Sequence, residues 1–570
     1  MRVTRPPAVE RLPKDRYQVT LADGSPFFIR GAEFQNSSCS SAQYMEKIWP
    51  KVIAQNVNTV LGPIAWEDIE PAEGEFQWDL LDALIVGARS HGLRLILLWF
   101  GAWKNGKSTY VPGWVKTNPT RFPRARIQTS PGSPAVIADV LSPLSPSVLA
   151  ADQKAFVALM EHLRETDQDD GTVIMMQVEN EVGLLGDSRD RSNLANQAFS
   201  APVPDEVVER LKDAAKSGHL NSLITANLPM LSDNDFLSHK GFSWQETFGV
   251  SLHTDELFMA YHYAKYIDSL ASAGRQIYDI PFYTNGWLRT VNAVPSSTAG
   301  GGALPGEYPS GGPADSVIDV YHLFAPNLLF VSPDIYLVDY EEIFKAYTHR
   351  GQPLFIPEHR RDEYGAIRIW QAIGDYNAIC VSPFGVDTLD PHDSPWTKHY
   401  GLLKKVEPLI LDAWRKGSNV SGFYFDAFLP GQSDPSIAKE VVMGEWHLRF
   451  ERAKIFGHPA AGYGLVIQES KNVFLLIGEG YMVTFASTSS QSSFSGILAF
   501  NEMEMVEIGS NKMRKIRTLN GDETKSGAAA VMPTCGSGPD YGDFPIAITI
   551  PGETSIATCE VYSLSDDSAL

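Results

Sequence analysis

Two apolar runs decide the fold of this 570-residue chain: Thr172-Val-Ile-Met-Met-Gln-Val-Glu-Asn-Glu-Val-Gly183 and Pro353-Leu-Phe-Ile-Pro-Glu-His359. Each run is strand-like and leads into a glutamate, Glu181 in the first and Glu358 in the second. In an α/β barrel the strand ends expose the working groups, because the eight β→α loops meet there around one cleft. The two runs therefore predict two barrel strands that each bring a carboxyl group to the same cleft.

Six further apolar runs are separated by stretches with helical spacing. They lie at Phe27–Glu33, Val57–Leu61, Leu93–Phe100, Pro281–Trp287, Leu328–Tyr336 and Ala378–Phe384. Apolar runs that alternate with amphipathic helices are typical of a parallel sheet covered on both faces. Eight such strands predict an α/β fold, a (β/α)8 TIM barrel over residues 1–415.

The composition changes after about residue 415. Short strand-like runs at Leu465–Gln468, Val473–Ile477, Met482–Ala486 and Ile546–Ile550 alternate with turns rich in Gly, Ser, Asn and Asp. No long helix is expected beyond the mid-440s. We therefore expect a smaller all-β, sandwich-like domain over residues 416–570.

The charge balance excludes several function classes. The chain has 68 acidic and 47 basic side chains, a formal net charge of −21 at pH 7. Such a surface repels phosphate backbones, so we expect no nucleic-acid partner. No apolar run approaches the roughly 20 residues that span a bilayer, so no membrane partner is expected either. The N-terminus lacks the apolar core of a secretory signal, which predicts a cytoplasmic protein, although secretion stays open if the chain is trimmed.

The four cysteines are Cys39, Cys380, Cys535 and Cys559, and no pair has the Cys-x-x-Cys spacing of a zinc site. Cys535 and Cys559 share the C-terminal region, so a disulfide between them stays open. Two free thiols are the favoured interpretation for a cytosolic protein. The sequence does not fix the oligomeric state, so a homo-oligomer stays open.

Two carboxyl groups from different strands are the minimum needed to cleave a glycosidic bond. One protonates the leaving oxygen, and the other attacks or supports the anomeric carbon. We interpret Glu181 as the acid/base and Glu358 as the nucleophile. The competing interpretation is that each glutamate caps a helix or pairs with a nearby cation. The run His359-Arg360-Arg361 fits both, because its cations would also keep a nucleophilic Glu358 ionised.

Glu179 competes with Glu181 for the acid role, because residues two apart on a strand share a face. Two features favour Glu181. It lies nearer the end of the strand, and Asn180 before it carries an amide able to bind a sugar hydroxyl.

Several other side chains at strand ends are candidate substrate-binding residues. Trp103, Trp287, Asn285 and Tyr336 are the preferred ones, since aromatic faces stack on sugar rings and polar neighbours indicate a wet cleft. Core packing is an equally good account of any one Trp, and a buried hydroxyl bonded to a carbonyl is an equal account of Tyr336. No His, Asp or Glu spacing indicates a metal, and this chemistry needs no metal or cofactor.

The Glu-Asn-Glu and Pro-Glu motifs resemble those of the retaining (β/α)8 glycosidases, the clan that includes β-galactosidases. The chain is most similar to the shorter glycoside hydrolase family 35 enzymes with a β-sandwich tail, over roughly residues 15 to 450. The resemblance is carried by Gly31-Ala-Glu-Phe-Gln-Asn-Ser-Ser38, Trp99-Phe-Gly-Ala-Trp-Lys-Asn105 and Gln177-Val-Glu-Asn-Glu-Val-Gly183. It implies that Asn180 and Glu181 are the Asn–acid/base pair and that Glu358 is the nucleophile.

One departure from the resemblance bears on specificity. Secreted members carry Asn-Ala-Glu at the end of the third strand, where this chain has Gly101-Ala-Trp103. A sugar-binding carboxylate and amide are missing there and an aromatic face is offered instead. Glu33 is a candidate to supply the lost carboxylate. Galactose preference is therefore implied by the resemblance but not fixed by these residues.

These observations predict a retaining exo-β-glycosidase, a β-galactosidase that acts on a carbohydrate substrate with terminal galactose. The long segments Gly183–Thr247 and Gly300–Gly312 would close the pocket. We expect a blind pocket lined by Glu33, Trp103, Asn180, Asn285 and Tyr336. If the long segments pack elsewhere, an open groove for internal cleavage results. Two further alternatives are the same chemistry on another terminal sugar (β-glucosyl, β-glucosaminyl or galactofuranosyl) and a catalytically silent carbohydrate-binding barrel.

Overall fold

The computed structural model describes residues 5–565 except 131, 234–240, 291–300, 338, 428–433, 454–460 and 536–549. The chain divides into two compact units that interleave along the sequence. The first comprises Met1–Val9, Val19–Arg360 and Cys380–Asp390, and the second comprises Glu10–Gln18, Arg361–Ile379 and Pro391–Leu570. The boundary expected after residue 415 stays a prediction.

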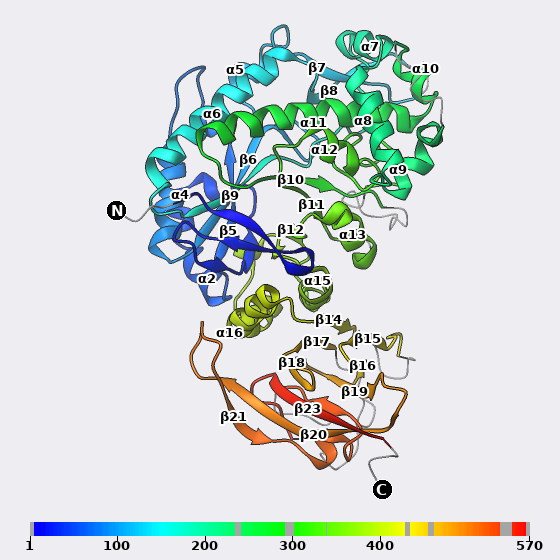
Figure 1. Ribbon diagram of the computed structural model, residues 1–570. Coiled ribbons are helices and arrows are strands. Elements are labelled where there is room, and N and C mark those ends of the chain that lie inside the picture. Colours follow the sequence, from blue (N-terminus) through cyan, green and yellow to red (C-terminus); the bar gives the residue numbers. More distant parts are fainter. Residues whose placement is uncertain are drawn as a thin grey trace. The chain divides into compact units, whose positions relative to one another are not determined.

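The first unit contains a closed parallel barrel (Figure 1). Six strands pair in the order β11-β10-β9-β6-β5-β4, and two more pair as β12-β13. Parallel bridges Ile335↔His359 and Glu33↔Phe384 join the two sheets into a ring. The strands are β4 (Gly31–Glu33), β5 (Thr59–Ala65), β6 (Arg94–Lys104), β9 (Val173–Asn180), β10 (Phe282–Trp287), β11 (Phe330–Asp334), β12 (Phe355–His359) and β13 (Cys380–Pro383). They coincide with the eight predicted runs, so the (β/α)8 fold class is confirmed.

Burial explains why these runs form the barrel. All eight residues of β9 are buried, as are all seven of β5, which is the pattern of strands covered on both faces. Figure 1 shows helices around the strands, among them α4 (Asp79–Ser90), α6 (Pro146–Asp167), α11 (Leu252–Ile277) and α13 (Tyr340–Tyr347). On α4 the side chains Leu81, Leu84 and Ile85 form a buried stripe toward the core.

The segment after β9 forms a helical excursion. Its helices are α7 (Asn193–Ser200), α8 (Asp205–Lys216), α9 (Ser222–Asn227) and α10 (Trp244–Phe248), which cluster in one region of Figure 1. On α8 the apolar residues Val207, Val208 and Leu211 are buried. The predicted segment Gly183–Thr247 is thus a small helical subdomain in the part that the structure describes.

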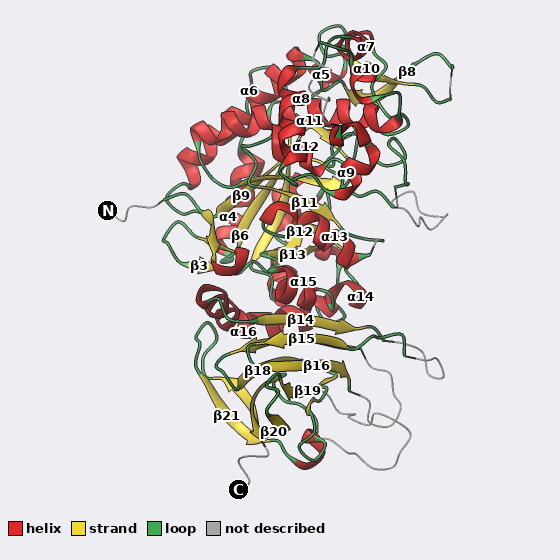
Figure 2. Ribbon diagram, turned by 45° about the vertical axis from the view of Figure 1, so that its right-hand side comes forward, coloured by secondary structure: helices red, strands yellow, loops and turns green. Residues whose placement is uncertain are grey.

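The second unit combines a two-sheet β-sandwich with helices. One sheet has the order β14-β17-β18-β23-β20-β21 and the other the order β15-β16-β19-β22, drawn as yellow strands in Figure 2. Phe423, Phe450, Leu476 and Val483 belong to the apolar core between them. The strands are β14 (Val420–Phe425), β15 (Lys439–Met443), β16 (Trp446–Arg452), β17 (Gly462–Gln468), β18 (Val473–Glu479), β19 (Tyr481–Ser487), β20 (Ser492–Met505), β21 (Met513–Thr518), β22 (Ala530–Met532) and β23 (Ile556–Ser565). The all-β tail is confirmed, while the expected strand Ile546–Ile550 lies outside the described residues except for Ile550.

The helices of the second unit are α14 (Glu363–Ala366), α15 (Ile369–Tyr376) and α16 (Pro395–Lys416). Helix α15 meets β14 at two glycines, because a Cβ on Gly374 would lie 2.2 Å from the Gly422 nitrogen. The remaining elements are β1 (Ala8–Leu12), β2 (Arg16–Thr20), β3 (Pro26–Phe27), β7 (Arg124–Ile127), β8 (Val136–Leu141), α1 (Ala42–Met45), α2 (Trp49–Ala54), α3 (Trp66–Ile69), α5 (Gly113–Lys116) and α12 (Ile318–Phe324).

All four cysteines are free thiols, so Cys535 and Cys559 are not joined. Among the described helices, none is both long and apolar enough to cross a membrane.

Candidate active site

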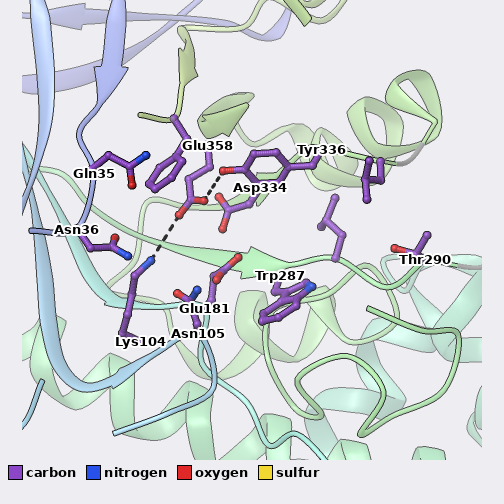
Figure 3. A pocket seen from close by; sticks show the side chains of 13 residues that line it. Gln35, Asn36, Lys104, Asn105, Glu181, Trp287, Thr290, Asp334, Tyr336 and Glu358 are labelled. Carbon is purple, nitrogen blue, oxygen red and sulfur yellow. Dashed lines mark hydrogen bonds and ion pairs between the residues drawn. The ribbon is translucent and has the colours of Figure 1, made fainter. Parts of the chain in front are cut away.

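A cavity of about 500 Å³ opens at the carboxyl ends of the barrel strands (Figure 3). Carboxyl ends of parallel strands are where barrel proteins place their binding groups, and the volume lies within the usual range of small-molecule sites. The residues that line it are Gln35, Asn36, Lys104, Asn105, Glu181, Trp287, Leu288, Thr290, Asp334, Tyr336, Leu337, Glu358 and Phe384.

Three carboxyl groups converge in this cavity. One oxygen each of Glu181, Asp334 and Glu358 lies within 4.8 Å of the other two. The three residues come from the ends of β9, β11 and β12, and all three are buried. The structure therefore brings the two glutamates chosen from the sequence together and adds an aspartate that sequence reasoning missed.

Different groups contact the two oxygens of Glu358. The Tyr336 hydroxyl donates a hydrogen bond of 2.7 Å to Oε2. The Lys104 ammonium lies 3.9 Å from Oε1, and both contacts are drawn in Figure 3. Burial alone would lower the pKa of Lys104, but the negative charges of Glu358 and Glu181 outweigh it and raise that pKa. Lys104 is thus a charged group inside the site.

Glu181 sits in surroundings that favour its protonated form. Burial, followed by the charge of Glu358, raises the pKa of Glu181 to about 7, against the lowering effect of Lys104. Its backbone N–H donates to Asn285 Oδ1 at 3.0 Å, and Asn285 Nδ2 donates to Asp334 Oδ2 at 2.7 Å. Asn285 therefore links the end of β9 to the end of β11 by hydrogen bonds, and it does not line the cavity.

Glu179 does not take the place of Glu181. Its carboxylate accepts hydrogen bonds from the backbone N–H groups of Ala102 and Trp103, at 3.1 and 2.8 Å, and it is not among the residues that line the cavity. Both glutamates have a positive φ, 62° for Glu179 and 44° for Glu181. Because these left-handed residues break the two-residue alternation of the strand, the two side chains no longer share a face.

Trp103 does not line the cavity, contrary to the expectation of an aromatic face for the sugar. It is fully buried, and its indole N–H donates to the Leu141 carbonyl at 3.1 Å. Its ring packs edge-on against Tyr263 and Tyr266. Strand β6 runs on past Trp103, so Lys104 and Asn105 reach the cavity instead. The core-packing account is therefore the one that the structure supports for this residue.

The other predicted residues fall into two groups. Trp287 and Tyr336 line the cavity. Glu33 and Asn180 are completely buried behind the lining. Burial, together with the charge of Glu358, raises the pKa of Glu33 well above its ordinary value. The side-chain amide of Asn180 has no hydrogen-bond partner within the described residues.

Sequence reasoning missed Gln35, Asn36, Lys104, Asn105, Asp334 and Phe384 as lining residues. All of them stand at or just after a barrel strand. Position at a strand end, applied to every residue there whatever its type, is the signal that finds them.

Comparisons with known proteins bear on parts of the chain. A family model described as Beta-galactosidase, that of glycoside hydrolase family 42, matches residues 39–214. A model described as Domain of unknown function (DUF5597) matches residues 396–530. No curated protein sequence matches this chain. These findings support a β-galactosidase-like glycoside hydrolase and not the expected assignment to family 35.

Solved structures of β-galactosidases are also similar to this chain. That from Bacillus circulans sp. alkalophilus is 15% identical, with a TM-score of 0.44 over 68% of this chain and 57% of that one. That from Marinomonas ef1 is 15% identical, with a TM-score of 0.41 over 67% and 60%. That from the haloarchaeon Halorubrum lacusprofundi is 13% identical, with a TM-score of 0.44 over 66% and 58%. The chain thus matches less than two thirds of the length of each.

Proposed function

We propose that this chain is a retaining exo-β-glycosidase, and that its substrate carries a non-reducing terminal β-galactosyl group. The observation that carries the proposal is the closeness of Glu181 and Glu358, whose nearest carboxylate oxygens lie within 4.8 Å. Retaining glycosidases hold their two carboxyl groups about 5–5.5 Å apart, whereas inverting enzymes leave about 6.5–9.5 Å for a water molecule. A separation this short supports a retaining mechanism, in which Glu358 acts as the nucleophile.

The reaction then proceeds in two displacements. Glu358 attacks the anomeric carbon and forms a glycosyl ester, while Glu181 gives its proton to the departing glycosidic oxygen. Glu181, now a carboxylate, takes a proton from water as that water attacks the anomeric carbon. The sugar leaves with its original configuration, Glu358 returns as a carboxylate, and Glu181 is protonated again.

The surrounding residues support each role. A pKa of about 7 leaves about half of Glu181 protonated at pH 7, whereas a carboxyl group at its ordinary pKa of 4.5 would be almost fully ionised, so the site supplies the proton that a general acid requires. The Lys104 ammonium and the Tyr336 hydroxyl hold Glu358 in place and balance its charge. Trp287 offers an aromatic surface for a sugar ring in the cavity.

The sequence motifs and the matched family model share one activity, although they differ in family. The sequence motifs resemble family 35, and the model that matches residues 39–214 is that of family 42. Both point to β-galactosidase-like chemistry on a barrel, and the proposal rests at that level.

A panel of nitrophenyl glycosides tests the proposal. We expect the highest kcat/KM on the β-galactoside, and no turnover by Glu358→Gln. A 2-deoxy-2-fluoro-β-galactosyl fluoride should inactivate the wild type, and mass spectrometry should find the sugar on Glu358. If another β-glycoside is the best substrate, the sugar is wrong and the mechanism stands. If no glycoside is turned over and no label forms, the chain is a binding protein and the proposal fails.

A further inference from the structure

The end of β6 leaves the regular sheet just before it reaches the cavity. Strand β6 pairs with β9 up to Trp99↔Val178, and the pairing resumes at Lys104↔Asn180. The four residues Phe100–Trp103 therefore lie opposite a single residue of β9, Glu179. Bulges next to active sites commonly re-aim a side chain. Here the residue that follows the bulge is Lys104, whose ammonium faces Glu358.

Glu179 fills the bulge from the β9 side. Its Oε1 accepts from the Ala102 N–H at 3.1 Å and its Oε2 from the Trp103 N–H at 2.8 Å. Gly101 gives the carboxylate room, because a Cβ there would lie 2.5 Å from Glu179 Oε1 and 2.3 Å from Trp99 Nε1. A φ of 62° carries a conformational cost for a residue other than glycine. The two backbone hydrogen bonds offset that cost and define the shape of the bulge.

Asp152 of helix α6 anchors the same carboxyl group from behind. It is fully buried, accepts from the Trp99 indole N–H at 2.9 Å, and accepts from the Tyr266 hydroxyl at 2.8 Å. Burial is the main reason why the pKa of both groups is raised. The charge of Asp152 also acts on the Glu179 carboxyl group and raises its pKa.

We propose that Asp152 and Glu179 form a positioning pair that holds Phe100–Trp103 in its bulge and thereby sets Lys104 against Glu358. Neither carboxyl group touches the substrate. The pair acts through Lys104, so its effect on turnover rests on the proposed function. Its effect on the position of Lys104 does not depend on that function.

A double-mutant cycle between Glu179→Gln and Lys104→Met measures the link. Glutamine would place its NH2 group against one of the two backbone N–H groups. Two donors cannot hydrogen-bond to each other, so the bulge must move. A displacement of about 1 Å in an active site costs about 10²-fold in rate, so we expect each single variant to lose about 10²-fold in kcat with little change in KM. The double variant should also lose about 10²-fold, because without Lys104 there is no ammonium left for the bulge to position. A loss equal to the product of the two single losses overturns the proposal.

Asp167→Asn is the matched control. Asp167 is also a buried carboxylate that accepts two backbone N–H groups, at Thr172 and Val173, but it lies at the other end of β9. Asp167→Asn should lower the melting temperature. Its effect on kcat, expressed as a free energy, should add to that of Lys104→Met. If Glu179→Gln does not fold, Asp152→Asn replaces it in the cycle.

Crystal structures of Glu179→Gln and Asp167→Asn provide a readout that needs no turnover. We expect the Lys104 Nζ to Glu358 Oε1 distance to exceed 3.9 Å in the first variant and to stay at that value in the second. An unmoved Lys104 in Glu179→Gln overturns the positioning role, whatever the activity. If the wild type turns over no glycoside while Lys104 still moves, the proposed function fails and the positioning role stands.

Discussion

The Lys104 ammonium lies 3.9 Å from Glu358 Oε1, and both side chains are about 95% buried. At this separation an ion pair gains about 4 kcal/mol at an effective dielectric constant near 20, before the cost of desolvation. Removing one partner of a buried pair leaves the other charge uncompensated. The cation therefore contributes to the charge state of the whole carboxyl cluster, including Glu181 and Asp334.

Lys104→Met should lower kcat/KM on a nitrophenyl β-galactoside by about 10- to 100-fold, which corresponds to about 1.4–2.7 kcal/mol of lost transition-state stabilisation. Methionine keeps the length of the side chain and removes only the charge. Lys107→Met is the control, because Lys107 lies in the same turn and is exposed. Steady-state kinetics of both variants decide the matter. Equal activity of Lys104→Met and wild type would show that the cation has no catalytic role.

The basic limb of the pH profile should report Glu181. The pKa of this group is about 7, so its protonated form is lost above that pH, and kcat/KM should fall as pH rises through 7. Lys104 is one of the groups that lower this pKa. Lys104→Met should therefore move the basic limb to higher pH. A shift to lower pH, or a limb that stays in place in Glu181→Gln, would exclude Glu181 as the titrating acid.

Glu181→Gln should stabilise the fold at alkaline pH. The folded pKa of Glu181, about 7, lies above its ordinary value of 4.5. The contribution of this group to stability is complete below pH 4.5 and is lost as pH rises from there through 7. At pH 8 the wild type buries a charge that glutamine lacks, so the variant should gain roughly 1–3 kcal/mol there and nothing near pH 4. Melting temperatures at both pH values test this, with the exposed Glu75→Gln as control.

Much of this fold was predictable because barrel strands are buried on both faces and appear as unbroken apolar runs. The end of β9 was predictable in position but not in orientation. Left-handed backbone at Glu179 and Glu181 decides which carboxyl group faces Glu358, and residue type gives no sign of it, since glutamate seldom adopts a positive φ. The choice of Glu181 rested on its place nearer the strand end.

The end of β6 shows why part of the site was not predictable. The pattern of apolar residues predicts which side chains of a strand face the core only where the strand stays in regular register with its neighbour. Four residues of β6 lie opposite Glu179, so Trp103 turns into the core and Lys104 turns into the cavity. The departure at Gly101 from the related Asn-Ala-Glu motif was visible in the sequence. Its cause, the Glu179 carboxylate that occupies the space of a side chain, was not.

The acid role of Glu181 predicts a dependence on the leaving group. Glu181→Ala should retain most activity on a dinitrophenyl glycoside, whose leaving group needs little protonation, while hydrolysis of a disaccharide collapses. The space left by the missing carboxyl group admits azide, which should speed turnover of the activated substrate and yield a glycosyl azide of the original configuration. Equal losses on both substrates would rule out Glu181 as the acid.

The shape of the cavity predicts where the enzyme cuts. An exo-enzyme closes the space beyond the terminal sugar, and the described part of the loop after β10 supplies Trp287, Leu288 and Thr290 to the lining. The opposite side is lined by Gln35 and Asn36, which follow β4. We therefore expect galactose to be the sole early product from an oligosaccharide decorated with terminal galactose, as measured by chromatography of initial products. Early release of longer fragments would show an open groove and internal cleavage.

A Trp287→Ala variant should raise KM for the oligosaccharide, since it removes an aromatic contact worth about 1–3 kcal/mol, while leaving the product pattern unchanged.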